Sequence, residues 1–303
     1  MAANPPTTYT CPWCGTQSTG TTTSCPACGA PTDIRLRVDS SGWVELPPIK
    51  GMTRIQCNNT QLQIHGSMAP VVEANVGQGD ALDFLHHVLL WRDDQIQLAQ
   101  VNPPGGWKRL IGGLPVFLTQ AQGPGRLCIS RRMPGELIAL PIHPGQALES
   151  KESTFLLATH SLTYSFVTAP TWFNTRDSDN NLEYHFPIGQ FLDIFAAQSE
   201  LPGLVIMHAI GNGFVRNLQA NESILIQPSS FLFKDSSVLL TMHLETAHGA
   251  PSPLFTGMTL FPSYLWLRAT GPGRIGIQSV TELVESPNLA MLAQHSPMTM
   301  HQW

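Results

Sequence analysis

The chain has 303 residues, of which 42% are hydrophobic and only 12% are Asp, Glu, Lys or Arg, with a formal net charge of -5. This length allows one large domain or two ordinary ones. The net negative charge gives no electrostatic reason to expect nucleic-acid binding, because phosphates require a basic face on the protein. No run of eighteen apolar residues occurs, so no membrane-spanning helix is expected. Because soluble domains usually carry about 25% charged residues, the low charge predicts a homo-oligomer that covers part of its own surface.

Two C-P-x-C-G motifs stand near the start of the chain, at Cys11 to Gly15 and at Cys25 to Gly29. Each motif presents two thiolates on a tight turn, and two such turns facing each other form the tetrahedron that Zn²⁺ prefers. The predicted ligands are Cys11, Cys14, Cys25 and Cys28. Because cysteine side chains would fill all four coordination positions of the metal, the single zinc is expected to be structural. Iron is the nearest alternative, but the polar connection from Thr16 to Ser24 cannot bury a redox centre.

The rest of the chain is expected to be all-β. From about Met52, short alternating segments are separated by Gly, Pro, Asn and Asp clusters, which is typical of strands and turns. A linker closing with Pro47-Pro48 precedes them and allows a short hairpin around Gly42. The expected organisation is a flexible N-terminus (1–8), a zinc ribbon (9–32), a linker (33–51), a three-repeat β domain (52–283) and a mobile tail (284–303).

Two segments have helical spacing of apolar residues. Gly189 to Leu201 carries Phe191, Ile194 and Phe195, and we predict a helix there. Asp80 to Trp91 has a similar spacing but also fits a strand with two covered faces, and the repeat pattern favours the strand.

Three segments share one frame, at residues 117–125, 205–213 and 265–273. Each is an apolar strand, an alanine, one variable residue and a G-x-G turn, followed by another strand. Downstream, Lys151-Glu152-Ser153 matches Lys234-Asp235-Ser236, so we interpret the segments as copies of one β unit. The turn glycines are expected to need positive φ or close backbone approach: Gly123, Gly125, Gly211, Gly213, Gly271 and Gly273. An anion-binding loop is the alternative for Gly-Pro-Gly-Arg, although no helix follows either copy.

The segment from Leu265 to Ser279, with its Gly-Pro-Gly-Arg turn, resembles the closing signature of the altered-inheritance-of-mitochondria-24 family. The middle turn from Gly211 to Glu222 is also similar, and the resemblance covers about residues 52–283. It implies three stacked sheets with pseudo-threefold symmetry, related in fold to the tryptophan RNA-binding attenuation protein. The family has no established enzymatic activity, and its mitochondrial members are implicated in inner-membrane organisation. The zinc ribbon and the less glycine-rich first repeat depart from the family pattern.

No catalytic motif is present: the chain has no G-x-S-x-G elbow, no H-E-x-x-H helix and no Walker loop. We therefore expect a non-catalytic scaffold whose β domain self-associates and whose ribbon recruits a protein partner. The alternative is a binding module for a small ligand or nucleic acid at the repeat junctions. Cys57 and Cys128 are expected to be buried free thiols. With no signal peptide visible at the start, these thiols and the thiolate zinc site favour the reducing cytoplasm.

Overall fold

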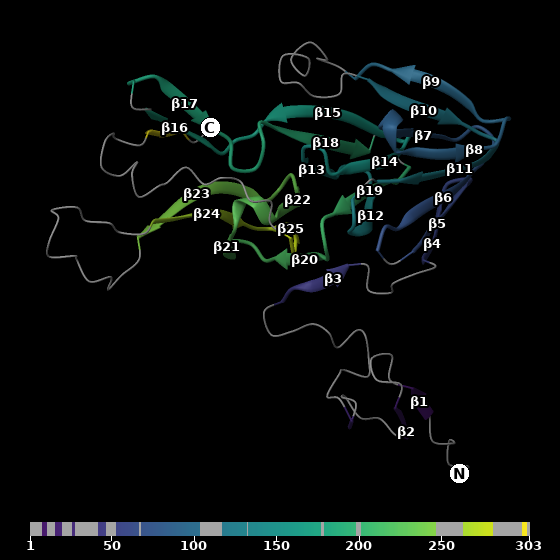
Figure 1. The fold of residues 1–303 in the computed structure, drawn as a ribbon, viewed down its shortest axis with the longest axis horizontal. Helices are drawn as coiled ribbons and strands as arrows, with labels where there is room; N and C mark the ends of the chain where they lie inside the picture. Colours follow the sequence, from purple (N-terminus) through teal and green to yellow (C-terminus); the bar gives the residue numbers. More distant parts are fainter. Residues whose placement is uncertain are drawn as a thin grey trace, which may run out of the picture.

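The computed structural model describes residues 8–10, 16–19, 26–27, 42–46, 53–66, 68–103, 117–131, 133–176, 179–197, 201–246, 263–280 and 299–301. Over these ranges the chain is all-β, as the sequence predicts, and has no α-helix (Figure 1). Two 3-10 turns interrupt the strands, η2 (His86–Val88) and η3 (Pro228–Ser230). No described helix is long and apolar enough to cross a membrane.

A six-stranded antiparallel sheet lies at the centre of the fold. Its order is β12 (Glu136–Ile142), β19 (Gly203–Ala209), β14 (Phe155–Thr159), β7 (Ala81–Phe84), β10 (Leu118–Gln122) and β9 (Gln97–Val101). Every residue of β14 and β19 is buried, so other protein covers both faces of the sheet at these strands.

Two further sheets contribute to the same hydrophobic core. The five-stranded sheet has the order β4 (Thr53–Cys57), β5 (Thr60–His65), β6 (Val71–Val76), β11 (Gly125–Ser130) and β8 (Leu89–Arg92). The seven-stranded sheet has the order β15 (Leu162–Thr168), β18 (Phe191–Ala197), β13 (Ala147–Lys151), β22 (Phe231–Asp235), β25 (Gly273–Gln278), β20 (Gly213–Leu218) and β3 (Val44–Leu46). Leu127, Phe84 and Phe233, one from each sheet, are fully buried together in this core.

Three smaller sheets complete the described structure. One has the order β21 (Ser223–Ile226), β24 (Ser263–Thr270) and β23 (Leu239–Thr246), and a second core cluster packs its inner side against the seven-stranded sheet. Another has the order β17 (Leu182–His185), β16 (Trp172–Arg176) and β26 (Thr299–His301). The last is the pair β1 (Thr8–Thr10) and β2 (Gln17–Thr19).

The three segments with a common sequence frame have the same strand pairing. Their central strands are β10, β19 and β24, and each is flanked on both sides by antiparallel neighbours. We name the resulting groups the first triad (β7-β10-β9), the second triad (β12-β19-β14) and the third triad (β21-β24-β23). Ala121, Ala209 and Ala269 occupy the same place in the three central strands and are all 0% exposed.

The G-x-G turns do not close hairpins, because each one carries the chain from one sheet into another. The turn after β10 leads to β11 in the five-stranded sheet, and the turns after β19 and β24 lead to β20 and β25 in the seven-stranded sheet. The turns are therefore corners between sheets, where two backbones approach closely.

The helix predicted over Gly189 to Leu201 is wrong, because this segment forms strand β18, paired on one side with β15 and on the other with β13. Phe191, Leu192 and Phe195 are all buried, so the strand lacks a polar alternation. A short apolar run with two covered faces cannot be told from a helix by periodicity alone.

The other structural expectations lie partly within the described residues. The strand favoured over Asp80 to Trp91 is confirmed as β7 and β8, with η2 between them. Cys57 and Cys128 are confirmed as buried free thiols. Within the expected linker, β3 pairs with β20 and Trp43 packs against the second core cluster. Most of the expected tail lies outside the described residues.

Candidate functional site

The first cysteine motif lies in the connection of a short hairpin. Strands β1 and β2 are antiparallel, with Thr10 opposite Gln17, and the connection contains Cys11 and Cys14. Pro26 and Ala27, the middle residues of the second motif, form a turn. All four cysteines are outside the described residues, and within the described ranges no group of three or more His, Cys, Asp or Glu residues is placed to hold a metal. A donor set of four thiolates on two turns suits Zn²⁺.

The predicted turn glycines fall into two groups. Gly125, Gly211 and Gly273 have positive φ angles of 148°, 74° and 133°. Gly123, Gly213 and Gly271 are instead in crowded places: an added Cβ would meet the carbonyl oxygen of Gly77, the side chain of Ile138 and the carbonyl oxygen of Gln219, respectively. All six positions are therefore unfavourable for a larger side chain, for two different reasons.

The arginines of the two Gly-Pro-Gly-Arg turns form ion pairs with aspartates from other parts of the fold. The guanidinium of Arg274 donates to both carboxylate oxygens of Asp235, with Nη2 2.9 Å from Oδ1 and Nε 3.1 Å from Oδ2. The Arg126 side chain contacts Asp93 through a single oxygen, with its Nε 3.3 Å from Oδ2. The Arg126 backbone N–H also donates to this carboxylate and holds the pKa of Asp93 below its ordinary value. These contacts favour a structural role for the turns over anion binding.

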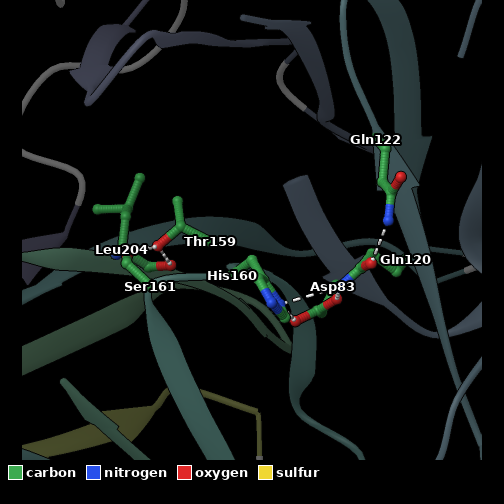
Figure 2. Close-up of polar contacts among 7 residues, drawn as sticks. All are labelled: Asp83, Gln120, Gln122, Thr159, His160, Ser161 and Leu204. Atoms are coloured by element: carbon green, nitrogen blue, oxygen red, sulfur yellow. Dashed lines mark hydrogen bonds and ion pairs between the residues drawn. The ribbon is translucent and has the colours of Figure 1, made fainter. Parts of the chain in front are cut away.

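A polar cluster lies where the first and second triads join. The joint is the antiparallel pair β14 and β7, in which Ala158 is opposite Asp83. His160, directly after β14, donates its backbone N–H to Ala81 at the start of β7. Its ring Nδ1 lies 3.0 Å from Oδ2 of Asp83, and Gln120 on β10 donates from Nε2 to Asp83 Oδ1 over 3.0 Å (Figure 2).

This geometry fixes the orientation of the His160 ring. Gln120 Nε2 also lies 2.9 Å from His160 Nδ1. Nδ1 is therefore within hydrogen-bond distance of both Asp83 and Gln120, and Nε2 is the ring atom left for a further partner. Gln122 donates to Gln120 Oε1 over 2.8 Å and extends the cluster outward. The Asp83 side chain is 11% exposed and the His160 side chain 55% exposed. The imidazole ring is therefore held by a buried carboxylate and faces solvent.

The hydroxyl groups beside His160 form a separate group of contacts. Thr159 Oγ1 lies 2.9 Å from Ser161 Oγ and accepts the backbone N–H of Leu204 over 2.9 Å, away from the imidazole (Figure 2). The nearby Cys57 thiol is also a poor nucleophile, because burial raises its pKa and so disfavours the reactive thiolate. The cluster can hold a polar ligand at His160 Nε2 but has no aligned nucleophile among these neighbours.

The sequence gives no local signal for this cluster. Asp83 and His160 are 77 residues apart and Asp83 and Gln120 are 37 apart. Only Gln120 lies in one of the repeat frames, and the strand order alone brings the three residues together.

The described residues form an all-β fold of several antiparallel sheets, and this fold defines the structural class of the chain. The sequence then identifies the family. Residues 62–280 match the model of the family described as mitochondrial biogenesis AIM24. The chain therefore belongs to the AIM24 family, as its turn motifs suggest.

A solved structure supports the fold. The chain is similar to the crystal structure of protein SPYM3_0169 from Streptococcus pyogenes, with 18% sequence identity and a TM-score of 0.50. The similarity covers 73% of this chain and 94% of that one. No curated protein matches the chain.

Proposed function

We propose that the chain is a non-catalytic scaffold whose β domain self-associates and whose N-terminal zinc ribbon recruits a protein partner. The observation that carries the proposal is the exposure of large apolar side chains on a surface with few charges. Met68, Leu239, Leu90, Leu201 and Tyr264 are each more than half exposed. An assembly that covers some of these residues would remove their apolar surface from water, which favours association.

We also propose that the three triads are copies of one unit related by pseudo-threefold symmetry. The common pairing of β10, β19 and β24 supports this, as do the three buried alanines in the same place. Acidic residues before or at the first strand of each triad add to the support. Asp80, Glu136 and Glu222 each accept a backbone N–H, from Asn59, Gly213 and Gln219 respectively.

The zinc ribbon would be formed by residues 9–32 with one Zn²⁺ held by Cys11, Cys14, Cys25 and Cys28. The paired strands β1 and β2 and the turn at Pro26–Ala27 fit two facing turns of this kind. A closed site of four thiolates leaves no position for substrate, so its contribution is to fold a small module that a partner can bind. Such a site fits the cytoplasmic location expected from the sequence.

The second candidate function is ligand binding at the junction between triads. The Asp83, Gln120 and His160 cluster is the specific observation in its favour, because the joint of two units presents an anchored imidazole to solvent. A thermal-shift screen of small anions and short oligonucleotides tests it. A ligand that raises the melting temperature of the parent chain but not that of the His160→Ala variant would support this function.

The solution mass of the full chain tests the scaffold proposal. One chain has a mass of 33.1 kDa. We expect light scattering at micromolar concentration to give a multiple of that mass. Removing residues 1–41, which leaves Trp43 and strand β3 in the β domain, should not change the number of chains in the assembly. A mass of one chain at every concentration, with and without those residues, would refute self-association.

A further inference from the structure

The third triad has one face packed on the core and one face that is partly exposed. On the inner side, Leu240, Leu267 and Ala269 are buried in the second core cluster. The cross-strand partners place the remaining residues on the opposite side: Leu225 pairs with Arg268, Leu239 with Thr270, His243 with Trp266 and Glu245 with Tyr264. We call these residues the outer face. Leu239 is 60% exposed and Tyr264 is 53% exposed.

The central strand of the corresponding face is buried in the other two triads. The common frame around the buried alanines aligns Trp266 and Arg268 with Leu118 and Gln120 in β10, and with Ile206 and His208 in β19. Those four residues are 3%, 7%, 0% and 2% exposed. In the first and second triads the chain itself covers the central strand on this face, whereas in the third triad Trp266 and Arg268 are only half-buried. The first triad is covered only in part, because its outer strand β9 is exposed on the same face.

The outer face is complementary to itself. Its acidic end carries Glu245, whose carboxylate accepts the Trp266 Nε1–H over 2.7 Å. Toward the other end lies Arg268, whose Nη2 is 3.0 Å from His243 Nδ1. A twofold axis through the middle of the face would stack the acidic end of one copy on the basic end of the other, with Trp266 at the centre. Closed twofold contacts of one patch with itself are the commonest way in which identical chains associate.

We infer that the outer face docks on the outer face of a second copy of this chain. The inference rests on the proposed self-association and assigns it to one surface. The strands have four, eight and eight residues, and with a spacing of about 4.8 Å they present roughly 320 Å² per copy. This is below the roughly 800 Å² per partner of a standard interface, so we expect a weak, reversible dimer.

Charge substitutions at the two ends of the outer face test the inference. Because Leu239 lies at the basic end, Leu239→Glu would face the partner's acidic end, and Tyr264→Arg would face the partner's basic end. In sedimentation experiments on the full chain from 1 to 100 µM, we expect each variant to weaken dimerisation at least tenfold. A one-to-one mixture of the two variants should dimerise again, because the introduced charges are then opposite. Met68→Arg is the control, since Met68 is 77% exposed and lies outside the third triad.

Each other outcome identifies what fails. If the parent chain self-associates and both outer-face variants do so equally well, the outer face is not the interface, while self-association stands. If the parent chain is a monomer throughout, self-association fails as well. If that monomer is also destabilised by Leu239→Glu and Tyr264→Arg but not by Met68→Arg, another segment of the same chain covers the outer face. If either variant loses dimerisation and the mixture does not restore it, the twofold arrangement is wrong.

Discussion

His208 is the buried histidine whose ionisation should most affect stability. It is 2% exposed, and its Nε2 lies 3.0 Å from the Met133 carbonyl oxygen, to which the neutral ring donates. Burial, followed by the nearby charge of Arg131, lowers the pKa of His208 from 6.5 to about 4. The unfolded chain therefore binds this proton more readily than the folded chain does between these two values.

The free energy of unfolding should consequently be highest above pH 6.5 and decrease as the pH falls toward 4. The His208 contribution to this loss is on the order of 3 kcal/mol. Urea unfolding at pH 7, 5.5 and 4.5 measures it. The His208→Gln variant retains a donor for Met133 but cannot titrate, so its stability should depend less on pH. An equal pH dependence in both proteins would show that His208 titrates normally.

Gly211 should be intolerant of a side chain. Its φ is 74°, and an added Cβ would meet Ser279 Oγ and come within 2.8 Å of Val280. We expect Gly211→Val to lower the free energy of unfolding by more than the roughly 1–3 kcal/mol of backbone strain alone. Gly145→Val is the matched control, since Gly145 has a φ of 77° and nothing within 4 Å of its added Cβ. Equal melting of the two variants would mean that the corner between sheets is not crowded.

At the scale of elements, a buried ion pair links two neighbouring strands of the seven-stranded sheet. Lys234 on β22 is directly opposite Glu149 on β13, and Nζ lies 2.8 Å from Oε2. The two side chains are only 6% and 16% exposed. Removing one partner leaves an uncompensated charge in the sheet, which is usually more costly than removing both.

We therefore expect Glu149→Gln to destabilise the fold by about 3 kcal/mol. The double variant Glu149→Leu with Lys234→Met should regain most of that loss, because no charge then stays buried. Chemical unfolding of the parent, single and double variants measures both steps. A double variant less stable than the single one would show that the ion pair contributes more than its desolvation costs.

The whole molecule should contain two parts that unfold separately. We expect about one zinc per chain by elemental analysis, bound through the four N-terminal cysteines. Cys25→Ser should remove the zinc and unfold residues 9–32, while the melting of the β domain changes little, because a linker and not a shared core joins them.

Cys57→Ser serves as the matched control for zinc binding, since Cys57 is a free thiol in β4. This variant should retain its zinc. Iron in place of zinc, or zinc that survives Cys25→Ser, would contradict the assignment of the ligands.

Local patterns in the sequence determined the class of this protein. Alternating segments and turn residues predict an all-β chain, and the three G-x-G frames point to its family. These features depend on backbone preferences of nearby residues, so a single sequence contains them. The four cysteines predict their metal for the same reason, because spacing within each turn sets the geometry of the thiolates.

Only the tertiary structure decided the features that depend on which strands become neighbours. Within the segment predicted as a helix, residues 191–197 form a strand because β13 and β15 pair with them on both sides. Asp83, Gln120 and His160 form a cluster because β7 lies between β14 and β10. The same frame position is buried at Gln120 and His208 but only half-buried at Arg268, whose triad forms a sheet separate from the other two. Such differences arise from contacts between residues far apart along the chain, and local patterning does not record them.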